Sequence, residues 1–213
     1  MALNLYFLRH GQTELSRDGV FCGAGMNPGL TTEGLLMAQS FFEFYAKTNW
    51  VAIYASPLMR AQLTAAPLSA AIKMSVISRA ELREIEFGKW EGKSISTVQQ
   101  DFADDYRAWS NDPLANAPSG GETALQIAAR MRVLVQEILG KHSDGNVLLV
   151  SHKATIRVAL CDLLGIDLAK YRDSLACPVA SVSVIEFNKR GPLLKELASR
   201  EHLSVKLREL PGT

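Results

Sequence analysis

Two arginines and two histidines stand where short apolar segments end, and their side chains suit the binding and attack of an anion. They are Arg9, His10, Arg60 and His152. A guanidinium group binds an oxyanion through paired hydrogen bonds, and an imidazole can act as a nucleophile or a base near neutral pH. Taken one at a time, each arginine is more typical of a surface cation, and each histidine is more typical of a loop histidine bonded to backbone. Their shared position at the ends of apolar segments favours one common site.

The apolar segments are short enough to be strands, and segments with helical periodicity lie between them. The predicted strands are residues 3–8, 51–55, 76–77, 146–150 and 181–187. The predicted helices are residues 31–46, 57–71, 122–139 and 155–164, with Leu125 and Leu139 on the apolar side of the third. Because strands alternate with helices, we predict an α/β fold in three α/β/α layers around a mainly parallel central sheet. Ligands bind such sheets at the carboxyl ends of the strands, where the two arginines and two histidines stand.

Length and composition indicate a single domain over residues 1–213. No repeat, low-complexity tract or linker divides the chain, and 213 residues can bury a sizeable core. Residues 112–121 have the composition of a loop. We predict that the polar and aromatic segment 84–121 is an insertion over the active site rather than a second domain.

Charge and cysteine usage narrow the classes of partner. The formal net charge of +1 gives no bulk field that would attract nucleic acid, so we expect no nucleic-acid partner. The chain lacks a run of about 18 apolar residues, so we expect no membrane span. Cys22, Cys161 and Cys177 lie far apart and lack the spacing of a zinc site, so we expect no metal. Arg9 interrupts the apolar amino terminus where a signal peptide would need its core, so we expect a cytoplasmic location.

Six short motifs follow one another in an order and spacing that resemble the histidine phosphatase superfamily. They are Arg9-His10-Gly11-Gln12-Thr13, Asn27-Pro28-Gly29-Leu30-Thr31, Ser56-Pro57-Leu58-Met59-Arg60-Ala61, Leu82-Arg83-Glu84 with Gly88-Lys89-Trp90-Glu91-Gly92, Gly120-Gly121-Glu122-Thr123 and Ser151-His152. The branch resembled contains cofactor-dependent phosphoglycerate mutases, alpha-ribazole phosphatases and metal-independent phosphoserine phosphatases. The resemblance implies a phosphoglycerate mutase-like fold and a phosphatase that needs no cofactor.

The resemblance also assigns roles to the residues of the motifs. It makes His10 the nucleophile that forms a phosphohistidine, with Arg9, Arg60 and His152 binding the phosphate oxygens. A neutral imidazole suits this role because a phosphomonoester carries close to two negative charges, which repel an anionic nucleophile. Glu84 matches the general acid that protonates the leaving oxygen. Glu86 and Glu91 are the alternatives, and Glu86 would share a face with Glu84 in an extended segment.

Some positions depart from the pattern of the superfamily and bear on substrate contacts. Lys153 stands where the family commonly has a small residue, and we expect its side chain to point outward rather than to bind a second anionic group. Ser16 stands where relatives often carry Asn, and it is a candidate for a different substrate contact. Cys22 and Gly23 belong to a loop that lines the pocket in relatives, and we expect Cys22 to serve packing.

Hydrolysis is the predicted outcome, with phosphoglycerate mutase activity as the alternative. The mutases resembled here carry a longer insertion and two adjacent arginines after a Trp, whereas Trp109 is followed by Ser110-Asn111. Few further cations accompany Arg9 and Arg60 in the motifs, which favours a small phosphomonoester such as phosphoserine over a bisphosphate. A second alternative is a non-catalytic module that binds phosphate ligands. Because relatives include dimers, we also allow for a homodimer.

Overall fold

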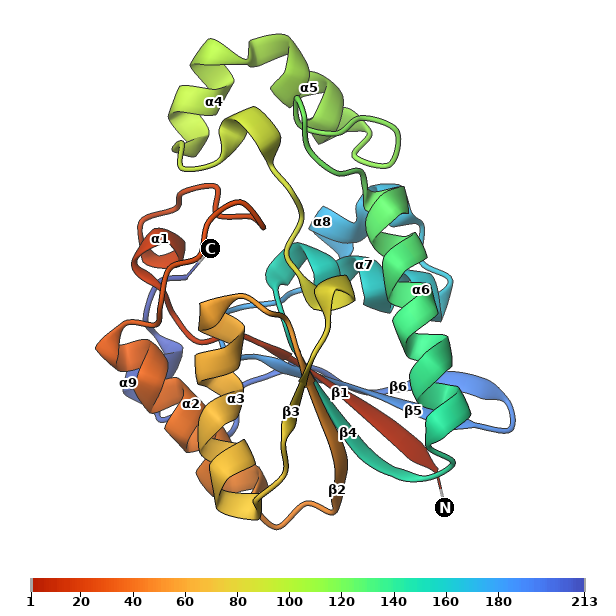
Figure 1. Cartoon of the computed structure of the whole chain (residues 1–213). Coiled ribbons are helices and arrows are strands. Elements are labelled where there is room, and N and C mark those ends of the chain that lie inside the picture. Colours follow the sequence, from red (N-terminus) through yellow and green to blue (C-terminus); the bar gives the residue numbers. More distant parts are fainter. Residues whose placement is uncertain (1, 213) are drawn as a thin grey trace.

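The computed structural model describes residues 2–212 and contains a six-stranded sheet with helices on both faces (Figure 1). The strands lie in the order β3-β2-β4-β1-β5-β6. Their bounds are β1 (Leu3–Arg9), β2 (Trp50–Ala55), β3 (Val76–Ser78), β4 (Gly145–Ser151), β5 (Val182–Asn188) and β6 (Gly191–Ser199).

Four neighbouring strands of this sheet are parallel. β1 pairs with β4, β4 with β2 and β2 with β3, all in parallel register. β5 runs antiparallel to β1 and is joined to β6 in a hairpin. The mainly parallel α/β sheet expected from the sequence is therefore confirmed. The carboxyl ends of β1, β2 and β4 meet at one edge of the sheet, since Arg9 pairs with Ser151 and Ala55 pairs with Val150.

Long helices cover the two faces of the sheet and make the expected three layers (Figure 1). On one face lie α2 (Thr32–Tyr45) and α3 (Met59–Ile72). On the other face lie α6 (Ala124–Lys141) and α7 (Lys153–Leu164). Shorter helices are α1 (Glu14–Arg17), α4 (Ile95–Asp101), α5 (Ala103–Asn111), α8 (Tyr171–Ser174) and α9 (Val205–Arg208), with single 3-10 turns at Ala80–Leu82, Gly88–Trp90 and Leu168–Lys170.

Side chains along each strand point to the two faces of the sheet and so belong to two hydrophobic cores. In β1, Leu5 and Phe7 belong to the core beneath α6 and α7, whereas Leu8 belongs to the core beneath α2 and α3, with Phe41. All four side chains are at most 1% exposed. Burying one such side chain stabilises the fold by roughly 1.5–3 kcal/mol. The sheet that carries the site is therefore held from both faces.

Side chains both near and far in sequence fix the starts of helices α2 and α3. Thr31 accepts the backbone N–H of Gly34 at 3.0 Å and begins α2. Asn27 Oδ1 accepts the backbone N–H of Met59 at 2.6 Å and so caps α3 from a distant loop. The prediction that Leu125 and Leu139 lie on the buried side of α6 is wrong, since they are 53% and 37% exposed.

Residues 84–121 place two helices beyond the carboxyl ends of the parallel strands. Figure 1 shows α4 and α5 at the top of the molecule, away from the sheet. They carry a small aromatic core in which Trp90, Val98 and Trp109 are buried and Phe21 and Phe87 are partly buried. No helix within residues 2–212 is long and apolar enough to cross a membrane.

The loop after β1 packs closely against the start of α2 at two glycines. A Cβ added at Gly11 would lie 2.5 Å from the carbonyl oxygen of Gly34. A Cβ added at Gly34 would lie 2.1 Å from the carbonyl oxygen of Gln12. Both contacts are with backbone, which cannot move aside as a flexible side chain could. The glycines therefore set the position of the loop that follows His10.

Gly34→Ala is expected to destabilise the fold by about 1–3 kcal/mol, because the new methyl group forces the backbone of the loop and helix apart. Urea unfolding monitored by circular dichroism measures this change. Gly140→Ala is the matched control, since nothing lies within 4 Å of its added Cβ inside α6. That control is expected to gain up to about 1 kcal/mol, because alanine is the better helix former. Equal free energies of unfolding for the two variants would contradict the close packing of Gly34.

Candidate active site

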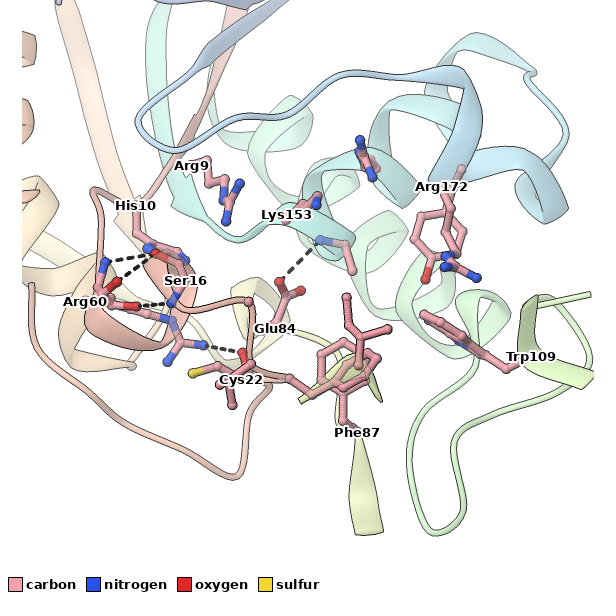
Figure 2. A pocket seen from close by; sticks show the side chains of 18 of the residues that line it. Arg9, His10, Ser16, Cys22, Arg60, Glu84, Phe87, Trp109, Lys153 and Arg172 are labelled. Atoms are coloured by element: carbon pink, nitrogen blue, oxygen red, sulfur yellow. Dashed lines mark hydrogen bonds between the residues drawn. The ribbon is translucent and has the colours of Figure 1, made fainter. Parts of the chain in front are cut away.

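A cavity of about 380 Å³ opens at the carboxyl edge of the parallel strands, and most of the predicted site residues line it (Figure 2). Those that line it are Arg9, His10, Ser16, Cys22, Arg60, Glu84 and Lys153. His152 is fully buried next to the cavity, with its ring centroid 5.1 Å from that of His10. Gly23 and Glu86 do not line the cavity.

His10 follows β1 and is held in one tautomer. Its Nδ1 lies 2.7 Å from the carbonyl oxygen of Gly11, which can only accept a hydrogen bond. Nδ1 therefore carries the proton, and the neutral ring has its lone pair on Nε2. Burial, followed by the charges of Arg60 and Arg9, holds the pKa of His10 well below its ordinary value. The ring is thus neutral at physiological pH, with Nε2 able to share its lone pair.

Arg60 lies in the first turn of α3, and its guanidinium group is held on several sides. Nη1 donates to the carbonyl oxygen of Met26 at 2.9 Å, and Nη2 donates to that of Gly23 at 3.1 Å. Nε donates to Nδ1 of His152 at 3.1 Å. The side chain is 1% exposed, so its position in the wall of the cavity is set before any ligand binds.

The contact with Arg60 also fixes the protonation of His152. Because Nδ1 accepts from Arg60, the proton of the neutral ring lies on Nε2. Burial and the charge of Arg60 hold the pKa of His152 well below its ordinary value. Nε2 is buried and has no hydrogen-bond partner among residues 2–212. An oxyanion held between His10 and His152 would accept from this N–H group, which otherwise bears the full cost of burial.

Glu84 lines the cavity, and its carboxylate lies against the start of α7. Its carboxylate accepts the backbone N–H groups of Ala154 at 3.3 Å and Thr155 at 3.2 Å, and that of Ile85 at 2.9 Å. Ala154 and Thr155 belong to the first turn of α7, whose dipole favours a negative charge there. Glu84 is 7% exposed and lines the cavity, so it can exchange a proton with a bound molecule.

Arg130 of α6 holds the segment that leads to Glu84, and sequence reasoning missed it. Its guanidinium pairs with Glu122 through two hydrogen bonds of 2.8 and 3.0 Å. It also donates to the carbonyl oxygen of Glu81 and, at 3.3 Å, to the hydroxyl of Thr155. Arg130 therefore ties the turn before Glu84 to the start of α7. The one feature of the sequence that could have pointed to Arg130 is its partner Glu122, the acidic residue in the Gly-Gly-Glu-Thr motif.

Cys22 and Gly23 belong to a loop that wraps around Arg60. The carbonyl oxygens of both accept from Arg60 Nη2, at 3.5 and 3.1 Å. The backbone N–H of Gly23 donates to Glu91 at 2.9 Å, so Glu91 fixes the loop and does not line the cavity. Burial raises the pKa of the Cys22 thiol, which keeps it protonated. Gly23 thus contacts the arginine rather than the cavity.

Ser16 and Glu86 were candidates for substrate contacts, but Ser16 caps a helix and Glu86 is exposed. Ser16 is part of the capping box of α1, where its hydroxyl accepts the backbone N–H of Thr13 at 3.0 Å. It still lines the cavity. The side chain of Glu86 is 51% exposed and lies 3.9 Å from Arg83, so it points away from the cavity and does not share a face with Glu84.

The prediction that Lys153 points outward is wrong, because Lys153 lines the cavity. The expectation of few further cations is also wrong, since Arg157 of α7 and Arg172 of α8 line the same space. Neither arginine belongs to a motif. They reach the cavity because α7 and α8 pack together beside it, which sequence spacing alone does not reveal.

Comparison with known proteins agrees with this geometry. The sequence profile of the histidine phosphatase superfamily (branch 1) matches residues 5–200. Phosphoserine phosphatase 1 of Hydrogenobacter thermophilus is 30% identical over 201 residues, which make up 94% of each chain. Adenosylcobalamin/alpha-ribazole phosphatase of Escherichia coli is 28% identical over 93% of this chain and 97% of its own. The solved mycobacterial glucosyl-3-phosphoglycerate phosphatase matches with a TM-score of 0.86 and 27% identity, over 94% of this chain and 100% of that chain.

These relatives confirm the expected superfamily and its phosphoglycerate mutase-like fold. Each of them is named as a phosphatase. The profile match covers all six sequence motifs. The chain belongs to branch 1 of the histidine phosphatase superfamily and is an enzyme of the phosphoric monoester hydrolase class.

Proposed function

We propose that this enzyme hydrolyses a small phosphorylated metabolite, without a metal, through a phosphohistidine formed on His10. The observation that carries the proposal is the hydrogen bond from Nδ1 of His10 to the Gly11 carbonyl oxygen. It leaves the Nε2 lone pair of a neutral ring for attack, while Arg9 and Arg60 stand beside it in the same cavity. Such a pairing of a neutral nucleophile with cationic clamps suits phosphoryl transfer.

In the first step, Nε2 of His10 attacks phosphorus, and the bond between phosphorus and the leaving oxygen breaks. The electron pair of that bond passes to the leaving oxygen, which takes a proton from Glu84. Arg9, Arg60 and the Nε2–H group of His152 bind the other phosphoryl oxygens. They stabilise the charge that these oxygens carry in the transition state.

In the second step, water attacks the phosphorus of the phosphohistidine. The Glu84 carboxylate takes a proton from this water, the N–P bond breaks, and its electron pair returns to Nε2 of His10. Inorganic phosphate then leaves, and the enzyme regains its starting protonation. Glu84 therefore serves as acid in one step and as base in the next.

We also propose that the chain acts as one domain over residues 1–213, with residues 84–121 as the insertion over the active site. Tyr106 and Trp109 of α5 line the cavity, which supports this role. Among substrates, phosphoserine is the first candidate because the relative in Hydrogenobacter thermophilus is named for it.

The proposal is tested by measuring inorganic phosphate released from p-nitrophenyl phosphate and from a panel of metabolite phosphomonoesters in the presence of EDTA. We expect steady release at one phosphate for each ester consumed. Interconversion of 2- and 3-phosphoglycerate without release would instead show a mutase. Binding of phosphoesters with no turnover of any of them would show a binding module.

A further inference from the structure

One wall of the cavity is built from three cations that have no acidic partner in the described part of the chain. Lys153 and Arg157 come from α7, and Arg172 comes from α8. Among residues 2–212, none of these three side chains forms an ion pair. We call Lys153, Arg157 and Arg172 the cationic wall. Figure 2 shows His10 and Arg60 at one side of the pocket, Arg172 at the other, and Lys153 between them.

Two members of the cationic wall are the residues at the start of α7 that are not buried in the core. From Ser151 to Leu160 every residue is buried except Lys153 and Arg157, which are half-buried. Their spacing of four residues puts both on the same face of the helix. Like charges at this spacing destabilise a helix, and the amino-terminal end of a helix disfavours cations. The fold therefore retains a costly pair of charges that points into the cavity.

The charges of the wall act on one another and on the phosphate-binding side of the cavity. Burial, followed by the charges of Arg9 and Arg157, lowers the pKa of Lys153 to about 8. Lys153 therefore remains mostly protonated near neutral pH. The carboxylates that line the same cavity are Glu84 and Asp173. Glu84 is occupied by the backbone of α7, and Asp173 makes no ion pair with the wall.

Arg172 and Arg157 both keep N–H groups free for an anion. The guanidinium carbon of Arg172 lies 3.7 Å from the ring centroid of Trp109. Stacking fixes the plane of the guanidinium group but leaves its N–H edge open. Nε of Arg157 is buried and has no hydrogen-bond partner among residues 2–212. Buried donors of this kind are rare unless a ligand or water satisfies them.

We propose that the cationic wall binds a second anionic group, a carboxylate or a phosphate, on the body of the substrate. The inference rests on the proposed function, because it places the scissile phosphate at His10. The body between the two anionic groups lies along the apolar and aromatic part of the same cavity, which includes Phe87, Tyr106 and Tyr171. The preferred substrates are then phosphomonoesters of anionic metabolites rather than of neutral alcohols.

Pairs of substrates that differ in one anionic group test this inference. Phosphoserine and phosphoethanolamine differ in a carboxylate, as do 3-phosphoglycerate and glycerol 3-phosphate. Fructose 1,6-bisphosphate and fructose 6-phosphate differ in a phosphate. The measured quantity is the ratio of kcat/KM within each pair, for the unaltered enzyme and for the double variant Lys153→Met and Arg157→Met. Lys189→Met removes one exposed charge in the β5–β6 turn and controls for a change in net charge.

The unaltered enzyme is expected to prefer the more anionic member of at least one pair by about tenfold or more, as a charge-assisted contact provides. The double variant is expected to lose most or all of that preference. The Lys189→Met variant is expected to keep it. The carboxylate and phosphate pairs show which group the wall binds. Equal kcat/KM within every pair, or an undiminished preference in the double variant, would overturn the inference. Failure to release phosphate from any ester, including p-nitrophenyl phosphate, would overturn the proposed function instead.

Discussion

Replacing His10 with alanine will remove the phosphatase activity and leave the fold in place. We expect kcat to fall by about 10³-fold or more, because the phosphohistidine cannot form without this imidazole. His10 is 5% exposed and neutral, so its removal leaves a small cavity rather than an unpaired charge. Release of inorganic phosphate from p-nitrophenyl phosphate measures the effect, and circular dichroism verifies the fold.

His142→Ala is the matched control for His10→Ala. His142 ends α6 at the opposite edge of the sheet from the cavity, near the start of β4 (Figure 1). We expect this variant to retain full activity. Rapid acid-free quenching with a labelled phosphomonoester should show a phosphoenzyme in the unaltered protein and in His142→Ala, but not in His10→Ala. Normal turnover by His10→Ala would refute the role of His10 as the nucleophile.

Glu84→Gln is expected to have an effect that depends on the leaving group. Glutamine keeps one acceptor oxygen, which can still accept from Thr155 and Ile85, but its NH2 group cannot accept from Ala154 as the second carboxylate oxygen does. The amide has nearly the same shape as the carboxylate, so the loop should keep its place. It cannot supply a proton to the leaving oxygen. For phosphoserine, whose alkoxide is a poor leaving group, we expect kcat/KM to fall by about 10²–10⁴-fold. For p-nitrophenyl phosphate, whose phenolate leaves without help, the fall should be much smaller.

Glu86→Gln provides the comparison for Glu84→Gln. Glu86 lies two residues further on, but its exposed side chain points away from the cavity. We expect the kcat/KM of Glu86→Gln to match that of the unaltered enzyme for both esters. If Glu84→Gln lost the same factor with both esters, Glu84 would be a structural or binding group rather than the proton donor.

The sequence was most informative where the chemistry depends on neighbours along the chain. The run from Leu3 to Leu8 is a strand that ends at Arg9, and His10 follows it into the cavity. The same local logic places His152 directly after β4. In each case an apolar strand and the polar residues after it are adjacent in sequence. The position of each histidine therefore follows from the end of the strand that precedes it.

The features that could not be predicted depend on how distant elements pack. Arg157 lies one turn along α7, and only the position of that helix beside the cavity makes it part of a wall. Arg130 reaches the turn before Glu84 from α6. Leu125 and Leu139 fit the apolar period of their helix but lie beyond the strip that the sheet covers. Periodicity gives the face of a helix but not the width of the surface that it meets.

The cationic wall also bears on how a substrate is captured. Among residues 2–212, five cations and two carboxylates line the cavity, whereas the net charge of the whole chain is only +1. The remaining surface therefore carries a slight negative excess, and the molecule does not attract anions from afar. At physiological salt, electrostatic attraction is screened over about 8 Å. An anionic substrate is thus drawn inward only after diffusion has brought it to the mouth, so selection for charge occurs at the cavity itself.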